Sequence, residues 1–259
     1  MLTVVVTGGA SGIGEACARV LSARNWRVVI ADIDLDRARH VAADIGGEAL
    51  LLDVSNAEMT EQVAEECERR FGPVAGLVAN AGIIQSPLPP EKLSVDAFDR
   101  VVAVNFRGAY LTCVGFGSRM ARRGAGAIVT VGSITALRSA PLHAYAPSKA
   151  AVVHMTQCLA AEWARSGVRV NAVSPGYVTT EPLREAFRKG ERDPEALAGA
   201  AAMKRMVEPD EVACVVAFLL SSDASAVTGA NLPVDAGWLV GAHLVTYGGV
   251  PASRVVAEG

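Results

Sequence analysis

The sequence predicts an α/β fold, a single domain built around a seven-stranded parallel sheet with helices on both faces. Short apolar runs rich in valine and isoleucine alternate with longer segments of helical periodicity along the 259-residue chain. A glycine-rich turn directly follows the first of these runs. Such alternation favours right-handed strand–helix–strand units, in which the strands pair in parallel and the helices cover the sheet.

The expected elements follow from the two periodicities. Strands are predicted at 2–7, 27–31, 48–52, 76–80, 126–131, 168–173 and 231–234. Helices are predicted at 12–24, 34–45, 56–71, 94–122, 145–165 and 209–221. Interleaved charges of both signs at 181–205 predict an exposed, charge-balanced segment, which we expect to be a mobile lid over the substrate. No linker or repeat divides the chain, so we expect one domain over residues 1–259.

Composition narrows the function classes. The chain is 51% hydrophobic and 20% charged, as in ordinary globular proteins. A net charge of -3 without any basic run argues against nucleic-acid binding and favours a small-molecule ligand. The longest apolar run, 212–220, is too short to cross a bilayer, and the N-terminal run lacks the pattern of a signal peptide. We expect a cytoplasmic protein without membrane contact.

Cysteine and histidine spacing indicates neither disulfides nor a metal. The five cysteines are far apart and each falls in a predicted helix, which favours buried free thiols. The four histidines have no metal-ligand spacing with one another or with cysteine, so no metal site is expected. The cysteines are Cys17, Cys67, Cys113, Cys158 and Cys214.

The first strand-to-helix turn, TGGASGIG at 7–14, has the composition of a phosphate-binding loop. Glycines at 8, 12 and 14 allow a tight turn and a close approach of the backbone to a pyrophosphate, which would lie on the helix N-terminus. A tight connection without any ligand is the alternative interpretation.

Asp32 ends the second predicted strand, 18 residues beyond Gly14. A carboxylate there can accept hydrogen bonds from the adenosine ribose and would repel a 2′-phosphate. Because the glycine turn also lacks Lys and Arg, the sequence predicts NAD in preference to NADP. The alternative is an aspartate that caps the helix beginning near Asp34.

Tyr145 and Lys149 lie one helical turn apart, on the same face of a predicted helix. A neighbouring ammonium favours the phenolate, so we expect a lowered pKa for Tyr145 and general acid/base chemistry. Ser133 follows the predicted strand 126–131, at the sheet edge where α/β proteins bind ligands. A surface tyrosine beside a solvated lysine is the alternative.

Further polar residues fall at the same edge or inside a helix. Asp53 and Asn80 follow the third and fourth strands. Asn105 is polar among apolar neighbours, so its amide needs partners. Those partners could be site groups or simply neighbouring backbone.

Taken together, these residues resemble the short-chain dehydrogenase/reductase family. The motifs, in order, are TGGASGIG at 7–14, Asp32, DV at 53–54, NAG at 80–82, Asn105, Ser133, YAPSK at 145–149, PGYVTT at 175–180 and VTGANLPVDAGW at 227–238. The resemblance implies a Rossmann-like sheet and a tetrad in which Tyr145 is the general acid/base and Ser133 orients the substrate oxygen. Lys149 would lower the tyrosine pKa and hold the nicotinamide ribose, and Asn105 would fix a water.

The resemblance also implies the cofactor contacts. Ala79, before NAG, and a Ser133–Tyr145 interval of 12 depart from the usual family pattern, and the shorter interval weakens substrate analogies that depend on the loop between these two residues. The expected NAD-binding residues are Gly8, Ser11, Gly12, Ile13, Gly14, Asp32, Ile33, Asp53, Val54, Asn80, Ala81, Gly82, Tyr145, Lys149, Pro175, Gly176, Val178 and Thr180.

Four side chains are expected to face the substrate: Thr135, Arg138, His143 and Tyr177. Their polarity favours a polyol, sugar or hydroxy acid as the secondary alcohol that exchanges a hydride with NAD. The alternatives are a 3-oxoacyl-thioester reductase and a non-catalytic NAD-binding regulatory protein. Residues 239–259 extend beyond the usual family ending and could lie at a subunit interface, because the resemblance implies a homotetramer or dimer.

Overall fold

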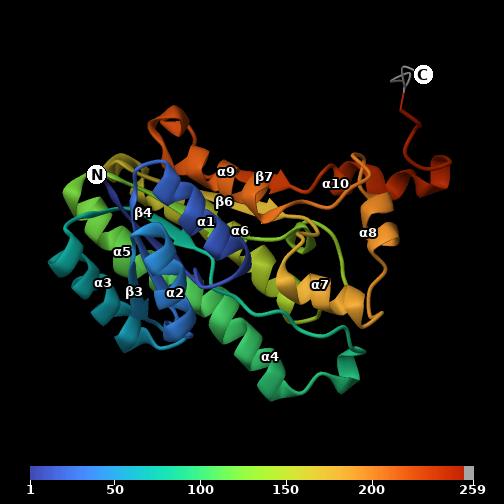
Figure 1. Cartoon of the computed structure of the whole chain (residues 1–259), viewed down its shortest axis with the longest axis horizontal. Helices are drawn as coiled ribbons and strands as arrows, with labels where there is room; N and C mark the ends of the chain where they lie inside the picture. The colour runs from blue at the N-terminus through green and yellow to red at the C-terminus, as the bar shows by residue number, and fades with distance from the viewer. Residues whose placement is uncertain (254–259) are drawn as a thin grey trace.

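The computed structural model describes residues 1–253, and within them lies the predicted seven-stranded sheet (Figure 1). Every pairing is parallel and the strand order is β3-β2-β1-β4-β5-β6-β7. The strands are β1 Thr3–Thr7, β2 Arg27–Asp32, β3 Glu48–Leu51, β4 Val74–Ala79, β5 Gly126–Val131, β6 Val168–Pro175 and β7 Asn231–Val234. The order reverses between β1 and β4, which makes this edge the expected position for a ligand.

Helices cover both faces of the sheet. The principal ones are α1 Gly12–Ala23, α2 Leu35–Ile45, α3 Ala57–Phe71, α4 Val95–Val102, α5 Ala109–Arg123, α6 Tyr145–Trp163 and α9 Pro209–Leu220. The side chains of β1 alternate between two cores, Val4 and Val6 in one and Val5 in the other. The first core includes residues of α1, α2 and α9, and the second includes residues of α3, α5 and α6.

The predicted continuous helix 94–122 is wrong in its middle. A π-helical segment, η2 Ala103–Gly108, separates α4 from α5. Gly108 of this segment lies against Val54, where a Cβ would come within 2.7 Å of a valine methyl. A π segment widens the helix locally, and periodicity over so few residues does not reveal it.

The segment predicted as an exposed lid contains two short helices, α7 Glu181–Arg188 and α8 Pro194–Ala200, neither with a buried residue. A parallel bridge between Val178 and Val207 closes the base of this segment. After β7 come α10 Trp238–Gly241 and a 3-10 segment, η6 Ala242–Tyr247. The lid helices and α10 lie toward the same end of the molecule (Figure 1). Residues 254–259 of the predicted C-terminal extension lie outside the described part.

The prediction of buried cysteines is correct for three residues and wrong for two. Burial raises the thiol pKa of Cys17, Cys67 and Cys113 to about 12. Cys158 and Cys214 are exposed free thiols, because they lie on the outer faces of α6 and α9. Among residues 1–253, no group of His, Cys, Asp or Glu has the arrangement of a metal site. No helix in this range has the length and apolar character that a membrane crossing requires.

Candidate active site

The glycine turn between β1 and α1 forms a backbone cradle. Gly8 and Gly12 have φ values of +63° and +55°, which residues other than glycine rarely adopt. A Cβ on Gly14 would lie 2.0 Å from the carbonyl oxygen of Gly8. The N–H groups of Gly12, Ile13 and Gly14, at the start of α1, have no intrahelical acceptor, and the first such bond is that of the Glu15 N–H to the Ser11 carbonyl. The cradle therefore fits the pyrophosphate of a dinucleotide, with Ser11 and Ile13 in the same turn.

Asn80 maintains the shape of this turn. Its Nδ2 donates to the carbonyl oxygens of Thr7 and Gly8, at 3.0 and 2.9 Å. A Cβ on Gly8 would lie only 2.8 Å from the Cα of Ala81, so the loop after β4 packs directly on the glycine turn. Asn80 thus contributes to the site by fixing the backbone of the glycine turn.

Asp32 joins the end of β2 to the glycine turn. Its Oδ2 accepts from the backbone N–H of Ala10, and its Oδ1 accepts from that of Asp34, both at 3.0 Å. The cap of α2 is Asp34, which accepts from the N–H of Arg37, so capping by Asp32 is not its role. A carboxylate has about four acceptor positions, so Asp32 retains capacity for ribose hydroxyls.

Three further predicted cofactor residues lie beside this turn. Ile33 is exposed directly after Asp32. Asp53 accepts from both the backbone N–H and the hydroxyl of Ser55, at 2.9 and 2.7 Å. Val54 is buried against Gly108. The end of β3 lies beside Asp32, because the N–H of Leu52 donates to the Asp32 carbonyl at 2.9 Å, and Val54 supports η2.

The segment after β6 lies opposite the glycine turn. A Cβ on Gly12 would lie 3.4 Å from a methyl of Thr180. The N–H of Gly176, next to Pro175, donates to the carbonyl of Val234 at 2.9 Å. Val178 is buried at the base of the lid. This segment therefore forms the second wall of the cradle.

Lys149 is buried, with 5% of its surface exposed. Its Nζ donates to the carbonyl of Val131 at 2.8 Å and lies 5.7 Å from the ring centroid of Tyr145. A Cβ on Gly82 would lie 3.4 Å from this Nζ and 3.2 Å from Oδ1 of Asn105. Burial lowers the pKa of the lysine to about 8. Lys149 and Asn105 thus converge on Gly82.

Asn105 finds its partners mainly in the backbone. Its Oδ1 accepts from the N–H of Ile83 at 2.8 Å, and its Nδ2 donates to the carbonyl of the same residue at 2.9 Å. Nδ2 also contacts the hydroxyl of Ser148 on α6 at 3.3 Å. The interpretation of an amide satisfied by neighbouring backbone is confirmed, and the amide also links the loop after β4 to α6.

The expectation of a lowered pKa for Tyr145 is wrong for the structure as it stands. Burial raises the pKa of the phenol, and a hydrogen bond with Ser133 opposes that rise. The lysine ammonium is itself disfavoured by burial and does not offset the rise. The hydroxyl of Ser133 also accepts from the N–H and hydroxyl of Thr135, at 3.1 and 3.0 Å. Ser133 and Tyr145 are therefore together, as the sequence predicts.

The structure separates the four predicted substrate residues. Thr135, Arg138 and His143 line a cavity of about 440 Å³ together with Ala146 and other residues of α6 and the preceding loop. Neither Ser133 nor Tyr145 lines it. Tyr177 lies elsewhere, with its ring edge-on to Trp238 at 6.0 Å. The first three residues thus face a hollow beside the tetrad.

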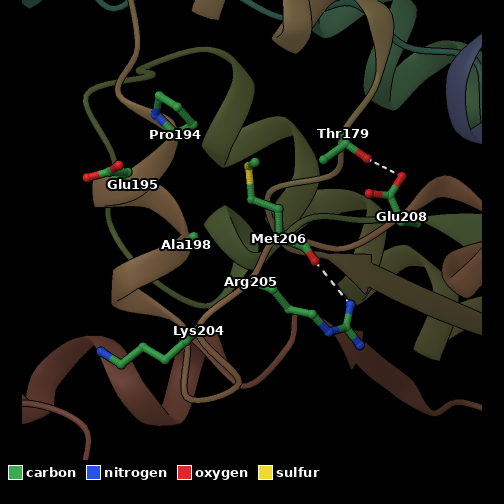
Figure 2. Close-up of a pocket in the computed structure, with 8 residues that line it drawn as sticks. All are labelled: Thr179, Pro194, Glu195, Ala198, Lys204, Arg205, Met206 and Glu208. Carbon is green, nitrogen blue, oxygen red and sulfur yellow. Dashed lines mark hydrogen bonds between the residues drawn. The ribbon is translucent and has the colours of Figure 1, made fainter.

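A second cavity, of about 420 Å³, lies beneath α8 (Figure 2). Glu208 accepts a hydrogen bond from the Thr179 hydroxyl at its rim, and Arg205 pairs with Glu211 at 2.7 Å. Its lining residues are Thr179, Pro194, Glu195, Ala198, Lys204, Arg205, Met206 and Glu208.

Sequence reasoning missed Gln85. Its side-chain oxygen accepts from the backbone N–H groups of Ala144 and Tyr145, at 2.7 and 3.1 Å. A single glutamine in a loop gives no signal of such a contact, because the partners are about sixty residues further along the chain.

The chain is similar to known proteins over most of its length. A family model described as Enoyl-(Acyl carrier protein) reductase matches residues 8–239. The galactitol 2-dehydrogenase of Rhizobium johnstonii is 40% identical over 243 residues, covering 90% of this chain and 93% of that protein. The NAD-dependent glycerol dehydrogenase of Listeria innocua serovar 6a is 37% identical over 242 residues, covering 91% and 93%.

A solved structure described as ribose-5-phosphate isomerase from Brucella melitensis 16M is similar along the whole chain. It has a TM-score of 0.95 and 44% identity, covering 97% of each chain. The extent of the model match and of these relatives shows that the chain belongs to the short-chain dehydrogenase/reductase family of nicotinamide-dependent oxidoreductases.

Proposed function

We propose that the protein is an NAD-dependent dehydrogenase of a polar secondary alcohol, with Tyr145 as the general acid/base. One observation carries the proposal. The Lys149 ammonium and the Asn105 amide converge on Gly82, and the ammonium lies 5.7 Å from the Tyr145 ring centroid, at the sheet edge that also carries the glycine cradle. This arrangement supports a proton-transfer group beside a dinucleotide site.

Each residue of the tetrad has a distinct role in this proposal. Tyr145 takes the proton of the substrate hydroxyl, and Ser133 holds the substrate oxygen. Lys149, fixed through Val131, holds the nicotinamide ribose and favours the phenolate when it is charged. Asn105 fixes the loop after β4, and the water expected beside it stays a prediction. NAD, when bound, accepts the hydride and brings a positive ring to the site.

The cofactor preference rests on Asp32. Its carboxylate lies beside the glycine turn, where it favours ribose hydroxyls and repels a 2′-phosphate. The relative described as NAD-dependent supports the same preference.

The substrate proposal rests on polarity. Thr135, Arg138 and His143 offer hydrogen-bonding groups near the tetrad, and the two dehydrogenase relatives act, by their names, on polyols. A polyol, sugar or hydroxy acid is therefore our proposed substrate class.

The test is NADH formation by the purified protein with galactitol, glycerol, other polyols, aldoses, hydroxy acids and 3-hydroxyacyl thioesters. Each substrate is run with NAD and with NADP. Turnover of a polar alcohol with NAD supports the proposal. Preference for NADP would contradict the role of Asp32, and turnover of thioesters alone would favour the reductase alternative.

A second candidate is a sugar-phosphate isomerase, which the description of the similar solved structure favours. An isomerase of that kind moves hydrogen within one substrate and has no need of the glycine cradle or Asp32. Conversion of ribose 5-phosphate without any nicotinamide cofactor would establish it. Tight NADH binding without turnover of any substrate would instead favour a regulatory protein.

We also propose that the protein is cytoplasmic and works as a homotetramer or dimer, with the segment after Trp238 at an interface. Val240, Val245 and Tyr247 are exposed in this segment, which leaves apolar surface to cover. Truncation after Trp238 should reduce the assembly size measured by light scattering. An unchanged assembly and an unchanged substrate KM would rule out the interface.

A further inference from the structure

Gln85 is a buried amide that binds the start of the tetrad helix. It is 6% exposed and lies in the loop after β4. Its Oε1 accepts from two backbone N–H groups, those of Ala144 at 2.7 Å and Tyr145 at 3.1 Å. Its Nε2 is buried and has no hydrogen-bond partner in the part of the chain that the structure describes.

This contact replaces a missing helix cap. The first N–H groups of a helix have no intrahelical acceptor, and the cap residue of α6 is Ala144, whose side chain offers none. Gln85 supplies the acceptor from a distant loop. The nearby Ile83 is also tied down, because it is bonded to Asn105 of η2, and Asn105 contacts Ser148 of α6. The loop after β4 therefore holds the start of α6 directly through Gln85 and indirectly through Asn105.

The orientation of the amide is fixed by its partners. Turning it over would set its NH₂ group against two N–H donors, so the oxygen must face α6. The unpaired Nε2 destabilises the folded protein. A glutamate would accept both bonds, suit the positive end of the helix dipole and leave no unpaired donor. The hydrogen-bonding pattern therefore suits a glutamate at this position, and burial of its charge opposes that fit.

Glutamine and glutamate at position 85 differ in the charge that they bring to the backbone of Tyr145. Burial already raises the pKa of this phenol, and a negative charge at the backbone N–H of the same residue would raise it further. The nearest titratable groups along the chain are Lys149 on the same helix and His143 before it, while Asn105 of η2 and Ser133 are uncharged.

We propose that Gln85 is a positioning residue that holds Tyr145 in place without adding negative charge. This proposal rests on the proposed function of Tyr145 as the general acid/base. The first test uses the protein without cofactor. Amide hydrogen exchange at Ala144 and Tyr145 is measured by NMR in the wild type, Gln85→Leu and Gln85→Glu. Gln157→Leu and Gln157→Glu, on the exposed face of the same helix, are the controls.

Exchange rates at both amides are compared with those of other α6 amides in the same protein. We expect exchange to be about tenfold faster in Gln85→Leu and close to the wild-type rate in Gln85→Glu. The two control variants should exchange at the wild-type rate. Equal protection in Gln85→Leu and wild type would overturn the proposed tie, whatever the protein catalyses.

The second test is the pH dependence of kcat/KM for the alcohol found in the substrate panel. Gln85→Glu should shift the half-maximal pH upward by about one unit, because the new charge opposes the phenolate. Gln85→Leu should lower kcat about tenfold with little change in the KM for NAD. An unshifted profile in a folded Gln85→Glu protein would overturn the charge argument. A wild type without any turnover would refute the proposed function, and the exchange experiment would still decide the tie.

Discussion

The tetrad and the lid are built in opposite ways. Asn105 and Lys149 are 1% and 5% exposed, and backbone carbonyl or N–H groups satisfy their polar atoms. Helices α7 and α8 have no buried residue. Ion pairs such as Arg188–Glu185 and Lys189–Glu185 join their exposed side chains. Exposed pairs of this kind contribute little to stability.

In the proposed function, this contrast would separate the residues that carry out the reaction from those that select the substrate. Groups that move a proton must stay within a fraction of an ångström of their working positions, and a buried network provides that precision. A segment that contacts different substrates can be loosely held. Substitutions at the sheet edge should therefore have large effects, and substitutions in the lid small ones.

The largest expected effect is that of Tyr145→Phe. Removing the proposed acid/base group should lower kcat by about 10³-fold, within the usual range for general acid/base catalysis, while NADH binding stays normal. Steady-state kinetics and NADH fluorescence titration measure the two quantities. Retained kcat would mean that another group handles the proton.

Gly14→Ala tests whether the glycine turn binds the dinucleotide, because the added methyl group would clash with the backbone of the turn. The new Cβ would meet the Gly8 carbonyl at 2.0 Å, so we expect loss of NADH binding and a decrease in the free energy of unfolding of about 2 kcal/mol or more.

Gly199→Ala in α8 is the matched control, since a Cβ there has no atom within 4 Å. It should be neutral or stabilise the protein by about 0.5 kcal/mol. Calorimetry and titration with NADH measure both variants. Equal effects of the two substitutions would remove the contrast between cradle and lid.

Lys149→Met should stabilise the protein while abolishing turnover. The folded-state pKa of about 8 lies below the ordinary 10.5, so the buried ammonium opposes folding by about 3 kcal/mol below pH 8. Loss of the hydrogen bond to Val131 destabilises the variant by about 1 kcal/mol, so its free energy of unfolding should be about 2 kcal/mol higher than that of the wild type.

The gain should depend on pH with a definite sign. Between pH 8 and 10.5 the unfolded wild type binds more protons than the folded one, so the stability of the wild type rises with pH. The advantage of the variant should therefore shrink across this window and reverse above it, where only the lost bond of about 1 kcal/mol remains. Urea unfolding at several pH values measures it, and a constant difference would contradict the lowered pKa.

The smallest expected effect is that of Arg188→Gln in the lid. Its pairs with Glu181 and Glu185 are exposed, so neither Tm nor kcat should change measurably. A large fall in kcat/KM for one substrate, without a change in Tm, would instead identify Arg188 as a substrate contact.

The sequence predicts best where residue type and local order decide the structure. The strands, the glycine turn and the pairing of Tyr145 with Lys149 depend on short-range patterns. The π segment around Asn105 was missed because its residues are as helical in pattern as their neighbours.

Features that depend on distant contacts were not predictable. Gln85 binds a helix about sixty residues away, and the raised pKa of Tyr145 comes from burial by the whole fold. Cys158 was placed inside because α6 is apolar on nearly all sides, which hides its outer face from a sequence pattern.

The bridge between Val178 and Val207 determines how freely the length and sequence of the lid can vary. The N–H of Thr179 donates to the Val207 carbonyl, and the N–H of Val207 donates to that of Tyr177, so both ends of the lid meet at one fixed point. The entropy of closing a loop grows only logarithmically with its length, and doubling the length costs about 0.6 kcal/mol. Insertions and deletions between these anchors should therefore be tolerated, and the intervening residues could be replaced without moving the proposed proton-transfer residues.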